Sequence, residues 1–384
     1  MDMHSRKQLA QVVALRYWKA TKQEKSVILS EFCSNTDFER KYAIKVLRKA
    51  VLHPKKKGEK QKRKKPSKYM IIKATIKTLW EASDYPSGTR LHALLPELVD
   101  KGISYGEIHP NELQQKLLAQ ISSASIDRML QSEVRNRIRK INGQTRNGKL
   151  KYDIPFAIDA DAVTQPGTLE IDLVSHSGAT AMGEFINTLN TTDMITGWYE
   201  AEALMGKSQR AVDEAIQQIE KRLPFPLKGI DSDNGTEFIN GTLKRYAEQM
   251  KITFTRSRPY KKNDNAHIEQ KNFTHVRKII GYMRLDTKEQ QAMLNDLYRN
   301  ELRLYINYFQ PSQKLIKKER IGSKIKRVYD TAKTPYQRVL ENKDVPEEVK
   351  QKLREEYKTL NPFALKRTID QKLRKIMETV TEFV

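Results

Sequence analysis

Cysteine is almost absent from this chain, whose 384 residues include only Cys33. A lone cysteine cannot form an internal disulfide, and it cannot supply the closely spaced thiolates of a structural zinc site. No apolar run approaches the roughly 20 residues that a membrane-spanning helix needs, and the first residues lack the apolar core and cleavage site of a signal peptide. We therefore expect a cytoplasmic protein that is neither exported nor embedded in a membrane.

Negative charge is scarce relative to positive charge. Lys and Arg number 71 against 47 Asp and Glu, which leaves a net charge of +24. This excess favours a polyanionic partner, and nucleic acid is favoured over a membrane because no segment joins a basic face to a broad apolar one. Residues 54–68 carry nine basic side chains and one acid. We interpret them as a basic linker, which could be a plain solvated spacer, a strand that lies along DNA phosphates, or both.

Residues 1–53 are predicted to form a helix-turn-helix domain. Apolar residues recur at helical spacing from Lys7 to Lys19. Thr21-Lys-Gln-Glu24 and Thr36-Asp-Phe-Glu39 have the pattern of capping boxes. They predict the starts of two further helices, with a tight turn at Ser34–Asn35 between them.

The last of these helices has the character of a DNA recognition helix. We expect Tyr42, Val46 and Leu47 to pack inward. The basic residues expected to face outward and to contact DNA are Arg40, Lys41, Lys45 and Arg48. Short helices with solvated lysines are also common without any role in DNA binding, so the pattern leaves both interpretations open.

A second helical DNA-binding domain is predicted over residues 69–150. Helices are expected at 71–82, 90–101, 112–120 and 124–139. Gly102 is expected to close the second of them, the last two form a helix-turn-helix pattern, and residues 142–150 are expected to be a linker. The DNA-contacting candidates are Arg128 and Arg135. The packing residues expected on the last helix are Ile126, Met129, Leu130, Val134 and Ile138.

From about residue 165 to 285 the pattern changes to alternating strands and helices, which predicts an α/β domain with a mixed five-stranded sheet. The expected strands are 168–175, 183–189, 196–203, 227–231 and 252–255, with a hairpin turn at 190–194. The expected helices are 208–222, 236–250 and 265–283. No glycine-rich loop of the kind that binds dinucleotides or phosphates is found there.

Residues 286–384 are predicted to be mostly helical. The expected helices are 288–308, 346–358 and 368–378. No small β-barrel is indicated, and the sequence leaves the role of this region open.

Three acids in the α/β segment are placed where they could converge. Asp172 lies within the first expected strand, Asp233 directly follows a short apolar strand, and Glu269 lies in the first turns of a helix. Converging carboxylates repel unless a divalent cation neutralises them, and oxygen ligands without thiolates favour Mg²⁺ or Mn²⁺. Two such ions could promote cleavage of a phosphodiester.

Each acid also has a purely structural explanation. An Asp in a strand is often an edge residue, Asp-Asn-Gly is a common turn, and the helix dipole favours Glu at a helix start. A neighbouring acid, Asp231, is expected to point to the other face of the sheet from Asp233.

Together these residues resemble the catalytic core of the retroviral-integrase superfamily, in particular the transposases of bacterial insertion sequences. In that family 35 residues separate the last two acids of an Asp, Asp, Glu triad, and 35 residues separate Asp233 from Glu269. Asn234-Gly235 follows the second acid as in the family, Asn272 stands one turn after the glutamate, and Pro259-Tyr260 matches the family's Pro-Tyr. The resemblance covers about a third of the chain.

The resemblance implies an RNase H-like fold in which Asp172, Asp233 and Glu269 hold two Mg²⁺ or Mn²⁺ ions. The implied reaction is cleavage at the 3′ ends of a mobile element, followed by attack of the freed 3′-OH on target DNA. Element-end DNA and target DNA are the implied partners, and joining two ends requires a homodimer or larger assembly on DNA. The residues implied or favoured as DNA contacts around the site are Tyr260, Lys261, Lys262, Lys271, Asn272 and Lys278.

The chain departs from retroviral integrases because it cannot build their N-terminal His-His-Cys-Cys zinc domain, and this favours a bacterial element. No His-x-x-Arg motif occurs, which argues against a tyrosine recombinase. Two other functions stay open, namely a DNA-binding regulator that keeps the core as a scaffold and an RNase H-like nuclease. The sequence does not indicate whether a helper ATPase takes part.

Overall fold

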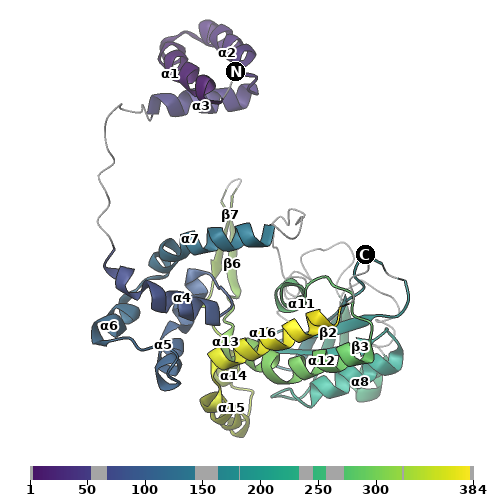
Figure 1. Cartoon of the computed structure of the whole chain (residues 1–384). Coiled ribbons are helices and arrows are strands. Elements are labelled where there is room, and N and C mark those ends of the chain that lie inside the picture. The colour runs from purple at the N-terminus through teal and green to yellow at the C-terminus, as the bar shows by residue number, and fades with distance from the viewer. Residues whose placement is uncertain are drawn as a thin grey trace. The chain divides into compact units, whose positions relative to one another are not determined.

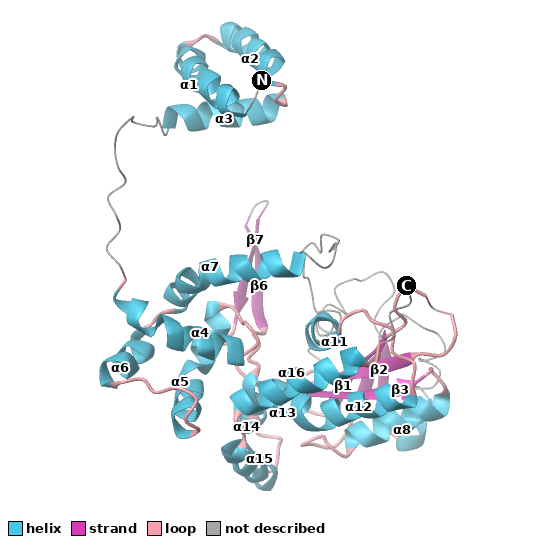
Figure 2. Cartoon of the chain, in the orientation of Figure 1, coloured by secondary structure: helices cyan, strands magenta, loops and turns pink. Residues whose placement is uncertain are grey.

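The computed structural model describes residues 3–52, 67–142, 163–180, 182–232, 245–256, 272–321 and 324–380. The chain divides into two units, Met1–Pro66 and Ser67–Val384 (Figure 1). The first unit is helical, and the second combines helices with two β-sheets (Figure 2). The division falls inside the predicted linker at 54–68, and the domain boundaries predicted further along the chain stay predictions.

Three helices form the first unit: α1 (Met3–Lys19), α2 (Lys22–Thr36) and α3 (Arg40–Leu52). The predicted capping box opens α2, because the Glu24 N–H donates to the Thr21 hydroxyl while the Glu24 carboxylate accepts from the Thr21 N–H. Small and aromatic side chains let the three helices pack closely. The core residues are Ala10, Ala14, Tyr17, Ile28, Leu29, Phe32, Ala43 and Leu47.

The second predicted capping box is wrong. Thr36 ends α2 instead of opening α3, because its hydroxyl donates to a carbonyl one turn earlier at 2.6 Å and Asp37 takes the left-handed conformation, with φ of 53°, that stops a helix. The connection therefore lies at 37–39 and not at Ser34–Asn35. Tyr42, which was predicted to pack inward, is 47% exposed and meets a phenylalanine ring edge-on at the surface.

The second unit begins with a helical region that confirms the four predicted helices. Its elements are η1 (Lys68–Ile72), α4 (Lys73–Ala82), α5 (Gly88–Ser104), α6 (Glu112–Gln120) and α7 (Ser123–Asn142). Gly102 does not close α5 but lies within it, where an added Cβ would come to 2.8 Å from Ile108. The glycine thus serves close packing, and α5 ends before Tyr105. Val134, predicted to pack inward, is 39% exposed.

The predicted mixed sheet is confirmed. Its strands are β1 (Thr168–Ser175), β2 (Ile186–Asp193), β3 (Tyr199–Met205), β4 (Gly229–Ser232) and β5 (Thr253–Arg256). They lie in the order β3-β2-β1-β4-β5. Strands β1, β2 and β3 pair antiparallel, whereas β4 runs parallel to β1 and β5 runs parallel to β4.

The predicted hairpin turn at 190–194 is displaced in the structure. Strand β2 continues to Asp193, and the turn follows it. The Asp193 carboxylate accepts the N–H groups of Gly167, Ile195 and Thr196 at 2.6–3.1 Å, so it organises the turn and ties it to the start of β1. Gly197, with φ of 76°, completes the reversal into β3.

Helices cover both faces of the sheet. α8 (Gln209–Glu220), capped by Ser208 as predicted, packs on the face that carries Leu169, Leu189 and Leu204. The helices on the other side are η3 (Asn272–Arg277), α11 (Lys278–Ile280), α12 (Lys288–Leu297), η4 (Tyr298–Leu302) and α13 (Arg303–Phe309). The helix predicted to reach residue 283 ends at Ile280, because Gly281 has φ of 89°.

The C-terminal region is mostly helical, as predicted, but the prediction missed a hairpin. The long helix expected over 288–308 is present as α12, η4 and α13 in succession. It is followed by β6 (Leu315–Ile321), β7 (Lys324–Tyr329), α14 (Pro335–Glu341), α15 (Glu347–Thr359) and α16 (Pro362–Glu378). The two strands pair antiparallel with a bulge between Leu315 and Lys317, and lysines on both sides hide the alternation that marks a strand.

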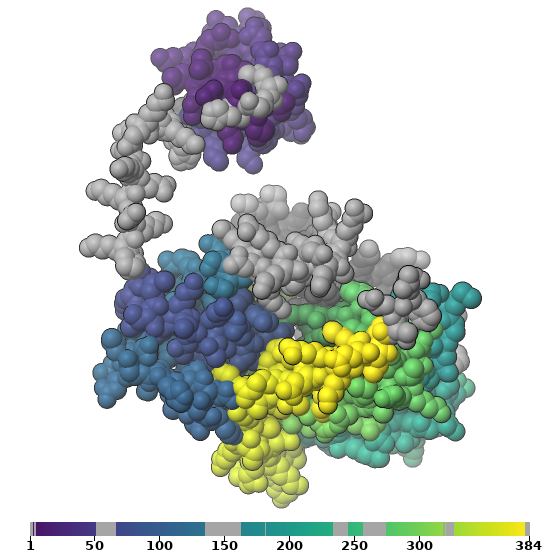
Figure 3. Space-filling view, viewed as in Figure 1, coloured from purple at the N-terminus to yellow at the C-terminus, as the bar shows by residue number. Residues whose placement is uncertain are grey.

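Helix α16 crosses the second unit and joins its parts (Figure 3). It contacts α4 and α5 at one end and α12, η4 and α13 along its length. One continuous core therefore runs from Ile72 to Ile376. Beside it Lys101, only 9% exposed, donates to the carbonyls of Tyr357 and Leu360 at 2.7 and 2.8 Å, which ties α5 to the end of α15.

Candidate active site and nucleic-acid interface

Asp172 lies on the central strand β1, as predicted. Its side chain is half-buried, and its Oδ1 accepts the N–H of Leu173 at 2.7 Å. Across the sheet Asp172 is paired with Asn190 of β2. It sits where the antiparallel part of the sheet meets the parallel part, because β1 pairs with β2 on one side and with β4 on the other.

Two further acids share this face of the sheet. Glu170 is two residues before Asp172 and pairs with Asp231 of β4, and both side chains are largely buried at 6% and 8% exposure. Asp231 in turn pairs with Thr255, whose hydroxyl donates to its Oδ1 at 2.5 Å. Residues in register on neighbouring strands, or two apart on one strand, point to the same side.

The expectation that Asp231 points to the other face from Asp233 stays a prediction, because Asp233 lies outside the described residues; its side relative to Asp172 is described. Asp231 shares the Asp172 face of the sheet, because its register with Glu170 fixes which side it occupies. The alternation of β1 would have identified Glu170 as a neighbour of Asp172. The position of Asp231 depended on a register that no local pattern carries.

Asp233 and Glu269, the other two predicted acids, lie outside the described residues. Strand β4 is described up to Ser232, which pairs with Ile171. Among the residues that are described, no group of three or more His, Cys, Asp or Glu side chains could hold a metal ion. The two-ion site thus stays a prediction.

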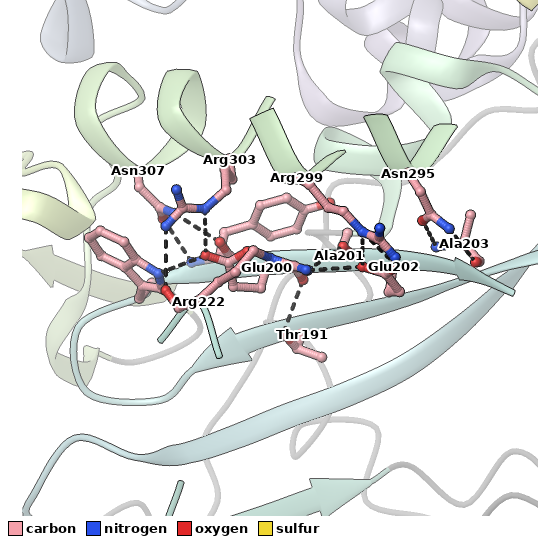
Figure 4. A network of polar contacts seen from close by, with 12 residues as sticks. Thr191, Glu200, Ala201, Glu202, Ala203, Arg222, Asn295, Arg299, Arg303 and Asn307 are labelled. Carbon is pink, nitrogen blue, oxygen red and sulfur yellow. Dashed lines mark hydrogen bonds and ion pairs between the residues drawn. The ribbon is translucent and has the colours of Figure 1, made fainter. Parts of the chain in front are cut away.

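A buried ion-pair cluster fixes strand β3 at the edge of the sheet (Figure 4). Glu200, fully buried, accepts from the Nε atoms of Arg222 at 2.8 Å and Arg303 at 3.0 Å. Glu202, 3% exposed, pairs with Arg222 at 3.1 Å and with Arg299. Each buried carboxylate is matched by arginines from α8's C-terminal side and from the long helix, so the cluster joins elements that are distant in the chain. No local sequence pattern signals the cluster, because its acids look like ordinary strand residues.

Amide side chains close the edge of the sheet at the same place. The side chain of Asn307 donates to the carbonyl and accepts from the N–H of Tyr199, both at 2.8 Å. Asn295 does the same at Ala203, at 2.7 and 2.9 Å. Asn295, Arg299, Arg303 and Asn307 recur every fourth position. The π-helical turn η4 lies within this stretch, and it keeps the four side chains directed at strand β3. The outer edge of β3 is thereby bonded to side chains of a helix.

A buried histidine supports the sheet under η4. His176 is fully buried, and its Nε2 lies 2.8 Å from the Thr188 hydroxyl, which lies 2.8 Å from the Tyr298 hydroxyl. Burial, with a smaller contribution from the charge of Arg277, lowers the pKa of His176 to about 3. The imidazole is therefore neutral at physiological pH and links the residue after β1 to β2 and η4 through polar contacts.

Helix α3 presents the basic face that the sequence predicted. Lys41, Lys45 and Arg48 are exposed, and their spacing places them on one face of the helix. The opposite face carries Ala43 and Leu47, both fully buried in the three-helix core. Arg40 is also exposed, but its guanidinium donates to the hydroxyls of Ser26 and Ser30, each at 3.1 Å.

The other predicted DNA contacts are described only in part. Arg128 is exposed on α7 and donates to Ala124 O and to Ser125 Oγ of its own helix. Lys278 bonds to Asp84 through both the carboxylate and the carbonyl oxygen. The backbone of Asn272 opens η3. The candidates whose side chains lie outside the described residues are Arg135, Tyr260, Lys261, Lys262, Lys271 and Asn272.

The described parts of the chain define a strongly basic protein that joins a three-helix unit to an α/β unit with an acidic sheet face. None of the described helices has the length and apolar composition that a membrane span requires. No family model matches the chain.

The chain is 36% identical over 344 residues to the uncharacterized protein y4rM of Sinorhizobium fredii (strain NBRC 101917 / NGR234). The match covers 88% of this chain and 96% of y4rM. The chain belongs to the same protein family as y4rM.

Proposed function

We propose that this protein is a DNA transposase of a bacterial insertion sequence, which binds the ends of its element, cleaves them at the 3′ side and joins them to target DNA. The observation that carries the proposal is the position of Asp172 on the central strand of a mixed five-stranded sheet. The strand order is compatible with an RNase H-like core. The 35-residue spacing from Asp233 to Glu269 supports the same assignment.

The pairing of β1 with β4 supports a shared site for the first two acids. Ser232, the residue before Asp233, is paired with Ile171, the residue before Asp172. Consecutive Cα atoms are about 3.8 Å apart, so this pairing limits how far apart in space the Cα atoms of Asp172 and Asp233 can be. Glu269 is assigned from the sequence only, by its spacing from Asp233 and by Pro259-Tyr260 and Asn272 around it.

The donor set fits a hard divalent cation. Asp172 offers a half-buried carboxylate on a face that it shares with Glu170 and Asp231, and no thiolate is near in sequence. Asp172, Asp233 and Glu269 would hold Mg²⁺ or Mn²⁺, which supplies nucleophile activation and charge stabilisation in phosphodiester cleavage. The protein contributes to catalysis by positioning the acids and by binding the DNA through its basic surfaces.

Helix α3 is expected to contribute phosphate contacts. The combined substitution Lys41→Ala, Lys45→Ala and Arg48→Ala should lower the slope of log affinity against log salt by up to about 0.9 for each phosphate that these side chains neutralise. Fluorescence anisotropy with an element-end duplex at several salt concentrations measures this slope. A matched triple at Lys7, Lys19 and Lys22, all exposed on the other helices, removes the same charge. An equal decrease in both triples would show a net-charge effect and would contradict a contact face on α3.

The enzymatic proposal is tested with the purified chain and labelled duplexes that carry the inverted repeats flanking its coding region. Nicks with a free 3′-OH and strand-transfer products are expected with Mg²⁺ or Mn²⁺ and not with a chelator. Asp233→Asn and Glu269→Gln should each abolish both products while end binding persists. Full activity in either variant would refute the assigned site. Specific end binding without any cleavage by the unmodified chain would favour a regulator, and cleavage of DNA or hybrids irrespective of the ends would favour a nuclease.

A further inference from the structure

The β6–β7 hairpin is a basic ribbon that the transposase assignment does not require. Its two strands contain six Lys or Arg residues and one acid, Glu319. Figure 1 shows the pair extending out from the helices of the second unit. Among the described side chains of the ribbon, Lys317, Lys326 and Arg327 are exposed, and the strand ends carry exposed Ile316 and Tyr329.

The charges lie on both sides of the ribbon. Glu319 pairs with Lys326, so Lys326 lies on the side of Glu319 and of Lys317, two residues before it. Arg327, the next residue, lies on the opposite side because successive side chains alternate. A solvated sheet that only covers a core would show charge on one side alone.

The base of the ribbon is held firmly, although Ile316, Lys317 and residues 326–329 are exposed. The Lys314 ammonium donates to the carbonyls of Met194 and Ile195 in the β2–β3 turn. The Asp330 carboxylate accepts from the Lys314 N–H at 2.6 Å and pairs with Arg338 of α14 at 2.8 Å. An isolated two-stranded hairpin is marginally stable in water, so these contacts give the ribbon a fixed root on the sheet.

We propose that the β6–β7 ribbon binds double-stranded DNA by entering a groove, with its basic side chains contacting phosphates on both walls. This inference rests on the proposed function for the presence of DNA, but it assigns a surface that the catalytic proposal leaves unused.

Size and composition favour duplex DNA over a protein partner. The major groove of B-DNA is about 12 Å wide and admits a two-stranded ribbon, whose strands lie about 4.8 Å apart. Basic residues on both sides match a groove, which presents phosphates on two walls. Protein interfaces are depleted of lysine at their centres, whereas four of the thirteen residues in these two strands are lysine.

The direct test is protection of the ribbon by DNA in the full chain. Lys326→Cys is made in a Cys33→Ser background, and its alkylation by a maleimide is followed with a duplex of about 40 base pairs, roughly four helical turns. At a duplex concentration about ten times Kd, mass action leaves roughly a tenth of the chain free, so alkylation should slow about tenfold. Lys352→Cys, at an exposed position of α15, is the matched control and should not slow.

A second measurement uses charge instead of protection. The triple Lys317→Ala, Lys326→Ala and Arg327→Ala should reduce the salt slope of duplex binding by about 2 to 3, whereas Lys343→Ala, Lys352→Ala and Lys358→Ala should leave it unchanged.

The outcomes separate this inference from the proposed function. Tight duplex binding with unprotected Lys326→Cys would overturn the ribbon assignment and leave the transposase proposal standing. Equal protection by polyglutamate of the same charge would overturn the choice of DNA as partner. Absence of any duplex binding by the unmodified chain would overturn the transposase proposal and the ribbon assignment together.

Discussion

Asp172→Asn should reduce 3′-end cleavage and strand transfer by at least about 100-fold, because even residues that only orient metal ligands cost roughly 10–100-fold when removed. Asparagine has the same shape as aspartate and its Oδ1 can still accept the Leu173 N–H, so the fold of β1 should persist. The substitution removes only the negative charge that a divalent cation needs. Cleavage is measured at saturating duplex over a range of Mn²⁺, and duplex Kd should stay unchanged or tighten.

Asp231→Asn is the matched control for Asp172→Asn. Asp231 lies on the same face, but it bonds to Thr255 and does not belong to the motif. An amide oxygen can keep that bond, so activity should stay within about tenfold of the unmodified chain. A decrease as large as that of Asp172→Asn would show that general negative charge on this face, and not the triad position, governs activity.

Glu200→Gln should destabilise the second unit by about 3–5 kcal/mol, because removing one partner of a buried pair leaves uncompensated charge. The Glu200 carboxylate pairs with Arg222 and Arg303, whose side chains are only 14% exposed. In the glutamine variant the amide NH₂ would face the N–H donors of these arginines. The free energy of unfolding is measured by urea titration followed by tryptophan fluorescence, which reports on Trp198, itself bonded to Glu200.

Glu214→Gln supplies the control for this measurement. Its partner Arg210 lies at 3.2 Å, but the two side chains are 62% and 90% exposed. Exposed pairs of this kind contribute at most about 0.5 kcal/mol. Similar effects in the two variants would show that the buried cluster carries no special stability.

Local patterns in the sequence predicted much of the fold. Strand β1 was predicted with the bounds that it has, because apolar and polar residues alternate from Thr168 to Ser175. Helix α8 was predicted from Ser208, whose side chain caps it by accepting from Ala211 N–H. Both signals are short-range and depend only on neighbouring residues.

Elements defined by tertiary contacts were predicted less well. Strand β2 is largely polar in sequence, yet all its residues are buried. The side chain of Asn187, for example, accepts from the Ser175 hydroxyl and donates to the Gly206 carbonyl. Alternation of apolar and polar residues could not locate the end of β2, because its polar side chains form hydrogen bonds with other strands instead of facing solvent. The β6–β7 ribbon was missed for the opposite reason, since neither of its sides is apolar.

In the candidate site, too, the features set by local patterns were predictable and those set by long-range contacts were not. The position of Asp172 followed from strand periodicity, and the basic face of α3 followed from helical spacing with Val46 and Leu47 opposite, although Tyr42 was wrongly placed on the inner side. The side on which Asp231 lies depended on its pairing with Glu170, which is a long-range register. The partners of Glu200 come from residues far along the chain and carry no local signature.

The place of α16 in the core has a consequence for synthesis on the ribosome. Helices α4 and α5 pack early against α6 and α7, but α16, which also contacts both of them, is synthesised after the other described helices. At about 5–20 residues per second, the nascent chain waits roughly 10 to 50 seconds between Leu130 and Pro362. The surface of α4 and α5 that α16 contacts stays uncovered during that interval, and a chain that terminates before Pro362 would lack this part of the core.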